Sequence, residues 1–230
     1  MAPSVTLPAA APESEDLAAR GLKITEIFTS IQGESDLVGW PTVFIRLTGC
    51  PLRCRWCDTP YSFQGGDWMS IEDIVTHAKD EGVGHVCVTG GEPLSQKRCL
   101  ELLEKLCDAG LVVSLETSGA VPVARVDRRV IKVMDLKAPG SGEVDRNLWD
   151  NLAHLQPRDQ IKIVVADRKD FDWAVAQVRE RDLTRWQVLF SPVWQVLHPK
   201  TLAEWIVAER APVRLQLQTH KYLWGEAQGH

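Results

Sequence analysis

The stretch Gly49-Cys50-Pro51-Leu52-Arg53-Cys54-Arg55-Trp56-Cys57-Asp58-Thr59 contains three of the six cysteines, spaced C-x3-C-x2-C. A loop this short directs three sulfurs to one place, and thiolates gathered in this way bind zinc or an iron–sulfur cluster. Structural zinc takes four ligands, and no fourth Cys or His lies nearby in the sequence. Three thiolates on a cubane leave one iron open for another ligand. Zinc remains an alternative that requires a distant fourth ligand.

The composition indicates one sizeable domain without a nucleic-acid or membrane partner. The 230 residues are 44% hydrophobic and 25% charged, with a net charge of -5. No extended basic run is present, and no apolar stretch reaches the ~18 residues of a membrane helix. The N-terminal residues lack a basic start and an apolar centre, so they do not resemble a secretory signal. We therefore predict a cytoplasmic protein, in which clustered cysteines bind metal or act in catalysis and do not form disulfides.

The domain boundaries follow from the same reading. We expect residues 1–22 to be a disordered lead-in, because they are rich in Ala, Pro and Glu. Residues 23–222 would form the domain, and residues 223–230 a C-terminal tail.

Strand and helix patterns alternate along the domain, which predicts a parallel sheet covered by helices. Helices are expected after Ser70 and over Ser95–Ala109, Asp145–Leu155, Asp170–Arg181 and Pro199–Glu209. Strands are expected over Lys23–Ser30, Thr42–Leu47, His85–Thr89, Leu111–Glu116, Val130–Leu136, Gln160–Val165, Trp186–Phe190 and Val213–Leu217. The predicted fold class is α/β, an incomplete TIM-type barrel of about six parallel strands with helical crossovers.

Polar or glycine-rich residues recur where successive strands end. They are Cys50, the segment 89–92, Glu116, Lys137 and Ser191. In parallel α/β sheets, ligands bind at the carboxyl ends of the strands, so these residues should converge on one site. This convergence predicts an enzyme.

Arg46 lies inside an apolar strand and therefore needs a partner, because an unpaired buried charge is costly. The residues alone leave two partners open for it, a bound anion or an internal Asp or Glu.

Two motifs resemble those of the radical S-adenosylmethionine (SAM) superfamily. One is the C-x3-C-x2-C loop with Trp56 before its last cysteine, and the other is Gly90-Gly91-Glu92-Pro93 after the next strand. Five segments are similar to the 7-carboxy-7-deazaguanine synthases within that superfamily: Ile31-Gln32-Gly33-Glu34, Arg46, Cys57-Asp58-Thr59, Thr89-Gly90-Gly91-Glu92-Pro93 and Gln218-Thr219-His220-Lys221-Tyr222. The resemblance covers about Lys23 to Tyr222 and implies the radical SAM core fold.

The resemblance implies a role for each matching residue, with no catalytic residue beyond the cluster and the cofactor. Cys50, Cys54 and Cys57 would hold a [4Fe-4S] cluster, and Thr59 would ligate Mg²⁺. SAM would lie against Trp56, Cys57, Asp58, Gly91, Glu92, Glu116, Asp135, Leu136, Lys137, Ser191, Pro192, Val193 and Trp194. The substrate would lie against Ile31, Gln32, Gly33, Glu34, Arg46 and Thr89, with Arg46 binding its carboxylate in a bidentate fashion.

The implied reaction converts 6-carboxy-5,6,7,8-tetrahydropterin to 7-carboxy-7-deazaguanine with loss of ammonia, in 7-deazapurine (queuosine) biosynthesis. A 5'-deoxyadenosyl radical takes a hydrogen from the substrate, and SAM is regenerated. The family also implies an electron donor such as flavodoxin and a homodimer. Two alternatives stay open: a radical SAM activase that generates a glycyl radical on a partner protein, and a zinc-stabilised binding module.

Overall fold

The computed structural model describes residues 17, 21–227 and 229. Most of the predicted lead-in, residues 1–16 and 18–20, therefore lies outside the described residues, as do residues 228 and 230 of the predicted tail. Among the described residues, no helix combines the length and the apolar character that crossing a membrane requires.

Within the described part of the chain, nine strands form one curved sheet in the order β3-β1-β2-β4-β5-β6-β7-β8-β9. Every neighbouring pair from β2 to β9 is parallel, which confirms the incomplete parallel barrel. The strands are β1 (Gly21–Ile31), β2 (Pro41–Leu47), β3 (Asp67–Ser70), β4 (His85–Gly90), β5 (Val112–Thr117), β6 (Ile131–Leu136), β7 (Gln160–Val165), β8 (Gln187–Pro192) and β9 (Arg214–Leu215).

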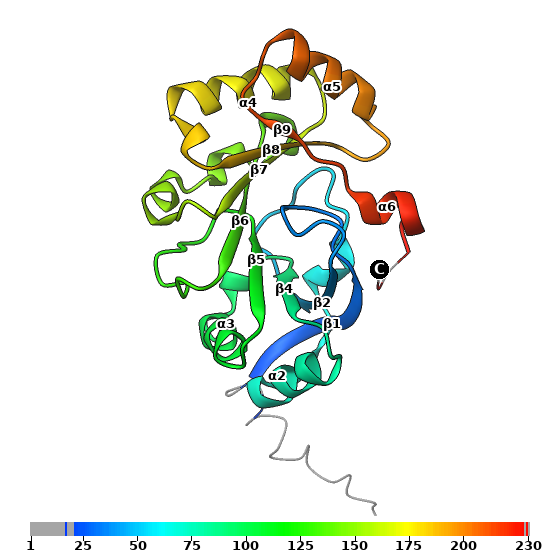
Figure 1. The fold of residues 1–230 in the computed structure, drawn as a ribbon, viewed down its shortest axis with the longest axis vertical. Helices are drawn as coiled ribbons and strands as arrows, with labels where there is room; N and C mark the ends of the chain where they lie inside the picture. The colour runs from blue at the N-terminus through cyan, green and yellow to red at the C-terminus, as the bar shows by residue number, and fades with distance from the viewer. Residues whose placement is uncertain (1–16, 18–20, 228, 230) are drawn as a thin grey trace, which may run out of the picture.

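The helices cover the outer face of the sheet, as Figure 1 shows for α2 and α3 at one end and α4 and α5 at the other. The α-helices are α2 (Ile71–Asp80), α3 (Cys99–Asp108), α4 (Arg168–Glu180), α5 (Pro199–Ala208) and α6 (Thr219–Trp224). Short 3-10 helices are η1 (Pro60–Phe63), η2 (Pro93–Ser95), η3 (Pro139–Ser141), η4 (Val144–Arg146), η5 (Trp149–His154) and η6 (Leu183–Arg185).

Local signals place the helix ends. The Ser70 hydroxyl accepts from the Asp73 amide at 3.0 Å and caps α2, as its sequence predicts. Asp167 caps α4 in the same way through the Asp170 amide. After α3, Gly110 adopts a φ of 83°, a left-handed conformation that glycine reaches at low cost and that ends the helix.

The period of two along each strand separates the core from the interior of the barrel. Outward residues such as Val43 and Ile45 of β2 join a core cluster with α2 and α3, and Ile161 and Ile163 of β7 join a second cluster with α4 and α5. The residues between them face inward. Near the carboxyl ends of five strands, this inward set carries polar side chains that line a cavity: Arg46, Thr89, Glu116, Asp135 and Lys162.

The first strand departs from the parallel prediction. β1 is antiparallel to both β2 and β3. It runs antiparallel to β2 because a short connection, without a helical crossover, joins Ile31 to Pro41. β1 also begins at Gly21, inside the predicted lead-in, since Gly21 and Leu22 pair with β3. Leu22 is buried in the core, which explains this ordered start.

The predicted helix over Asp145–Leu155 is wrong, since η4 and η5 occupy this segment. Its asparagine side chains bind the backbone of neighbouring loops. Asn147 accepts from the Lys137 amide at 2.8 Å, and Asn151 accepts from the Val123 amide at 3.0 Å. These bonds compete with a continuous α-helix.

Three further boundaries differ. The helix predicted over Ser95–Ala109 begins only at Cys99, after η2. The last strand keeps only Arg214 and Leu215. The segment Thr219–Trp224 forms α6, which extends two residues into the predicted tail.

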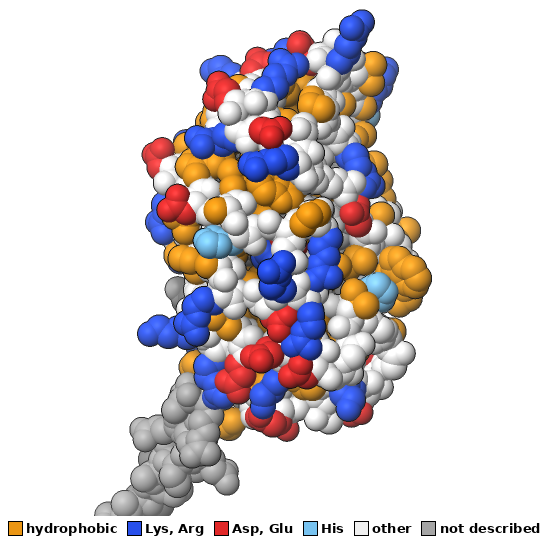
Figure 2. All heavy atoms as spheres, turned by 60° about the vertical axis from the view of Figure 1, so that its left-hand side comes forward, with side chains coloured by type: hydrophobic (Ala, Val, Ile, Leu, Met, Phe, Trp, Pro, Cys, Tyr) orange, Lys and Arg blue, Asp and Glu red, His pale blue; other side chains and the backbone are white. Residues whose placement is uncertain are grey.

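On the face shown in Figure 2, basic and acidic side chains are interspersed. Exposed ion pairs join neighbouring segments, as between Lys105 of α3 and Glu72 of α2 at 2.5 Å and between Arg129 and Asp108 of α3 at 2.7 Å. Exposed pairs of this kind add little stability individually.

Candidate active site

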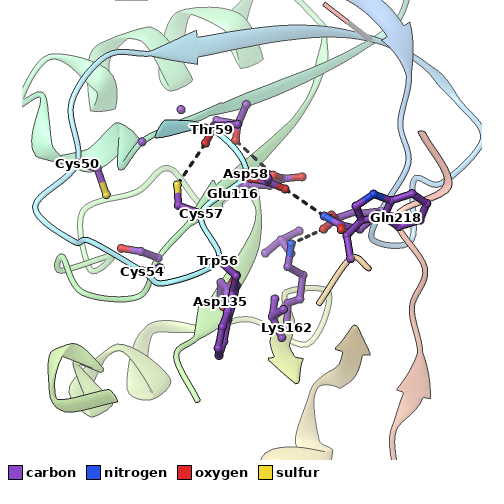
Figure 3. Close-up of a pocket in the computed structure, with 18 of the residues that line it drawn as sticks. Cys50, Cys54, Trp56, Cys57, Asp58, Thr59, Glu116, Asp135, Lys162 and Gln218 are labelled. Atoms are coloured by element: carbon purple, nitrogen blue, oxygen red, sulfur yellow. Dashed lines mark hydrogen bonds and ion pairs between the residues drawn. The ribbon is translucent and has the colours of Figure 1, made fainter. Parts of the chain in front are cut away.

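A cavity of about 520 Å³ lies where the parallel strands end. Its size is typical of a small-molecule site. Most of the predicted site residues line it. They come from strands β1, β2, β4, β5 and β6 and from the loops after β1, β2, β4, β6 and β8: Ile31, Gln32, Glu34, Arg46, Cys50, Cys54, Trp56, Cys57, Asp58, Thr59, Thr89, Gly91, Glu116, Asp135, Leu136, Lys137, Val193 and Trp194. Figure 3 shows the cysteines at one side of this cavity and Lys162 and Gln218 at the other.

The cysteine loop is tied to its neighbours by backbone hydrogen bonds. The Gly49 amide donates to the Ser62 carbonyl at 2.8 Å, and the Arg55 amide donates to the Ser141 carbonyl at 3.0 Å. Cys50 and Cys54 are half-buried, and burial raises the pKa of both thiols. Bound metal would counteract this by stabilising the thiolates.

The Gly90-Gly91 turn packs directly against the cysteine loop. A Cβ at Gly91 would lie 2.3 Å from the Gly49 carbonyl oxygen and 2.7 Å from Cβ of Cys50, so no other residue fits without movement. The next amide, that of Glu92, donates to the Gly49 carbonyl at 2.8 Å. The two motifs of the sequence therefore form one unit.

Glu92 was predicted to lie against SAM, but the structure does not place it in the cavity lining. The side chain is fully buried and has protein donors for both oxygens. Oε1 accepts from the Leu94 amide at 2.9 Å, and Oε2 accepts from the Thr117 hydroxyl at 2.9 Å and the Ser118 amide at 2.7 Å. Glu92 thus joins the turn after β4 to the end of β5.

Three more predicted residues do not line the cavity. Ser191 and Pro192 are buried in β8, and the chain turns toward the cavity only at Val193. Gly33 instead allows a close approach of the C-terminal segment. Its carbonyl accepts from the Thr219 amide at 3.0 Å, and a Cβ there would overlap the His220 ring.

At the opposite wall, Glu34 contacts two segments that are remote in the sequence. Its Oε2 forms an ion pair with Nζ of Lys162 on β7, and its Oε1 accepts from Nε2 of Gln218 at 2.8 Å. Burial would raise the pKa of the Glu34 carboxyl, but Lys162 outweighs burial and the pKa is lowered. Glu34 is therefore a fixed carboxylate.

Glu116 provides a contrasting carboxyl. It is bonded to the Thr89 hydroxyl at 3.3 Å, and burial followed by the charge of Glu34 raises its pKa. Two carboxyl groups with opposite shifts therefore face one cavity.

Arg46 has an internal partner and also faces the cavity. Its Nε donates to Oε1 of Glu26 at 2.7 Å, and the Tyr61 hydroxyl donates to the same oxygen at 2.9 Å. Burial, followed by the bond to Glu26, raises the pKa of Tyr61 to about 12 despite Arg46. Among the described residues, the two terminal nitrogens of Arg46 form no hydrogen bond, so they remain available to an anion in the cavity.

Asp58 connects the cysteine loop to α6. Its Oδ2 accepts from Nζ of Lys221 at 3.0 Å. The same oxygen accepts from Nε2 of Gln218 at 3.3 Å, and Figure 3 shows these two side chains. Burial would raise the pKa of Asp58, but Lys221 holds it at about 2. The carboxylate is thus engaged by the protein, although Asp58 still lines the cavity.

Two buried polar atoms at the cavity wall have no partner among the described residues. They are Oδ1 of Asp135, an acceptor, and Nε1 of Trp194, a donor. Asp135 Oδ2 pairs with Nζ of Lys137 at 3.2 Å. Such unsatisfied atoms are costly unless a ligand or water completes them, so this wall fits a polar ligand.

Several cavity residues were not assigned from the sequence: Phe28, Phe44, Lys162, Gln218, His220 and Lys221. For Lys162 a signal existed, because it is a lone charge in the apolar run QIKIVV, as Arg46 is in TVFIRL. Gln218, His220 and Lys221 belong to the last of the segments that carried the resemblance, but the sequence does not show where their side chains lie.

Comparison with known proteins finds one matching family model and several similar sequences. The model of the radical SAM superfamily matches residues 44–136. The chain is 47% identical over 207 residues to the 7-carboxy-7-deazaguanine synthase of Chlorobaculum tepidum, covering 88% of this chain and 94% of that one. It is 41% identical over 219 residues to that of Koribacter versatilis, covering 88% and 97%.

The fold is similar to the crystal structure of QueE from Escherichia coli. The TM-score is 0.70 at 25% sequence identity, and the match covers 92% of this chain and 100% of that chain.

Proposed function

The chain belongs to the 7-carboxy-7-deazaguanine synthase family, and on this premise we propose that its cavity converts 6-carboxy-5,6,7,8-tetrahydropterin to 7-carboxy-7-deazaguanine with loss of ammonia. It is a radical SAM enzyme whose cofactors are a [4Fe-4S] cluster and SAM. One observation carries the proposal: the cysteine loop, the glycine turn and a charged wall, formed by Glu34, Arg46, Glu116 and Lys162, line the same cavity.

The residues fit the cluster. Cys50, Cys54 and Cys57 all face the cavity, whereas Cys87 and Cys99 are buried in the core. The close packing of Gly91 against Gly49 holds the glycine turn beside the cysteines.

The chemistry supplied by cluster and SAM, when bound, is one-electron cleavage of SAM and abstraction of a hydrogen from the substrate. The residues of the cavity bind SAM and the substrate and orient them toward each other. Trp56 offers an apolar surface, Asp135 and Trp194 offer an acceptor and a donor without a partner among the described residues, and Gly91 lines the cavity beside the cysteine loop.

The charged wall fits the pterin. Glu34 is an acceptor for N–H donors of the ring, and the free end of Arg46 suits the carboxylate. Gln32, whose Oε1 accepts from the Glu34 amide at 3.1 Å, supports the same edge. Bound substrate would thus be held on one side by fixed charges, with its ring toward the cysteine loop.

We propose that Thr59 contributes to a magnesium site. Its hydroxyl lies 3.9 Å from Sγ of Cys57 and faces the cavity. Mg²⁺ in proteins usually keeps few protein ligands and takes the rest from water and substrate. Thr59 and the substrate carboxylate are such a set.

An electron donor such as flavodoxin and a homodimer remain predictions from the resemblance, and a cytoplasmic location remains a prediction from the sequence. The activase and zinc-module alternatives have less support, because the relatives named above are synthases over nearly their whole length.

An anaerobic assay tests the proposal. Protein reconstituted with iron and sulfide should contain about four irons per chain, with no stoichiometric zinc. With the tetrahydropterin, SAM and a reductant, it should release ammonia and form the deazapurine, detected by mass spectrometry. Omitting SAM is the matched control. A fully loaded protein that forms no product would refute the proposed reaction, and about one zinc with no iron would favour the binding module.

A further inference from the structure

Lys162 occupies the middle of the charged wall. It comes from β7, and only 12% of its side chain is exposed. Its register partner on β6 is Asp135, so β7 delivers one ammonium into a group of inward carboxyls. Figure 3 shows this side chain directed toward the same space as Gln218 and Asp58.

The two oxygens of Glu34 are divided between separate donors. Lys162 takes Oε2 and Gln218 takes Oε1, while 7% of the Glu34 side chain is exposed. With one donor on each oxygen, the plane of the carboxylate is fixed. Each oxygen still has a second lone-pair direction with which it can accept from a ligand.

The other carboxyl groups near Lys162 have other partners. Asp135 pairs with Lys137, and Asp58 pairs with Lys221. Glu116 has only the Thr89 hydroxyl, with no ion-pair partner among the described residues. Lys162 is therefore the cation on which the charge of Glu34 depends.

We propose that Lys162 is a positioning residue of the substrate site: its ammonium keeps Glu34 ionised and oriented to accept hydrogen bonds from the N–H edge of the pterin. This inference rests on the proposed function. Lys162 does not itself need to touch the substrate.

Without Lys162, the burial of Glu34 is no longer offset, so its pKa would rise. A protonated Glu34 would present a donor where the ring requires an acceptor. The other titratable groups facing this pair are Glu116, Asp135, Asp58, Lys137 and His220. Burial lowers the pKa of His220, so its imidazole stays neutral down to a lower pH than that of an ordinary histidine.

The test measures pterin affinity by anaerobic calorimetry on the reconstituted protein with SAM present, from about pH 6.5 to about pH 9. Wild type should show nearly constant affinity. Lys162→Met should bind about tenfold or more weakly at the lower pH and recover as pH rises, because Glu34 regains its charge. Lys162→Arg should stay within about threefold of wild type, since the charge is kept.

A double-mutant cycle adds a second readout. Glu34→Gln should lose affinity at every pH, and adding Lys162→Met should cost little more, because both act on one carboxylate. Lys200→Met removes an exposed charge on α5 and is the matched control. Iron content and thermal unfolding check each variant, and Lys162→Gln replaces Lys162→Met if the latter does not fold.

The outcomes separate the two proposals. If wild type does not bind the pterin, the proposed function fails. If wild type binds but the Lys162 variants bind equally well, or lose affinity equally at all pH values and additively with Glu34→Gln, only the role of Lys162 is refuted.

Discussion

The two sides of the cavity are built in different ways. The cluster side, residues 50–59 and 90–93, is made of two short motifs joined by backbone contact, such as the 2.8 Å bond from the Glu92 amide to Gly49. The substrate side is made of charged side chains remote in sequence. Glu34 lies 128 positions from Lys162 and 184 positions from Gln218.

This difference predicts different responses to substitution. Backbone packing against glycine leaves no space for added atoms, so changes on the cluster side should affect folding, cluster and SAM together. Side-chain charges can be removed with the backbone intact, so changes on the substrate side should affect binding more than stability.

The largest effect is expected for Cys54→Ala. Removing one of three thiolates should abolish cluster retention, and product formation should fall to background. Iron and sulfide analysis with ultraviolet–visible spectroscopy measures this. Cys107→Ser on α3, outside the cavity, is the control and should keep its iron. If Cys54→Ala protein kept a full, stable cluster, the assignment of the cysteine loop as the cluster-binding segment would be refuted.

Gly91→Ala should come next. The added Cβ would lie 2.3 Å from the Gly49 carbonyl oxygen, so the turn must separate from the cysteine loop. We expect at least about tenfold weaker SAM binding and a loss of about 1–3 kcal/mol of unfolding free energy. Calorimetry with SAM and urea unfolding measure the two. Gly84→Ala, where no atom lies within 4 Å of the new Cβ, should change neither.

Glu92→Gln tests whether Glu92 acts in stability or in cofactor contact. The amide would place a donor against Ser118 and Thr117, and we expect a loss of about 1–3 kcal/mol in urea unfolding. Glu104→Gln on the exposed side of α3 is the matched control. Unchanged stability with weaker SAM binding would reverse the structural assignment of Glu92.

The smallest effect is expected for Lys221→Met on the substrate side. Its pair with Asp58 is partly exposed, since 48% of the Asp58 side chain is accessible, so the loss in stability should be small. Looser docking of α6 should weaken pterin binding a few-fold, about threefold by calorimetry, with the cluster intact. Loss of iron in this variant would show that α6 also supports the cluster side.

The success of prediction from the sequence differs between features set by local patterns and features set by contacts between remote residues. The alternation of strands and helices was enough for the parallel barrel, since period-two patterns and caps such as Ser70 are local. The alternation failed over Asp145–Leu155, where Asn147 and Asn151 accept from the amides of Lys137 and Val123, which lie outside this segment and are not visible in its local pattern.

By itself, the sequence determined the cysteine loop, the glycine turn and the residue types of the cavity, because each motif is a short continuous stretch whose residue types and spacing can be recognised locally. Only the tertiary structure decided where Glu92 points, that Arg46 shares Glu26 while facing the cavity, and that Lys162 meets Glu34. The physical reason is that side-chain direction and charge pairing depend on strand register across the sheet. A residue's chemistry can be read locally, but its partner is set by which strands lie side by side.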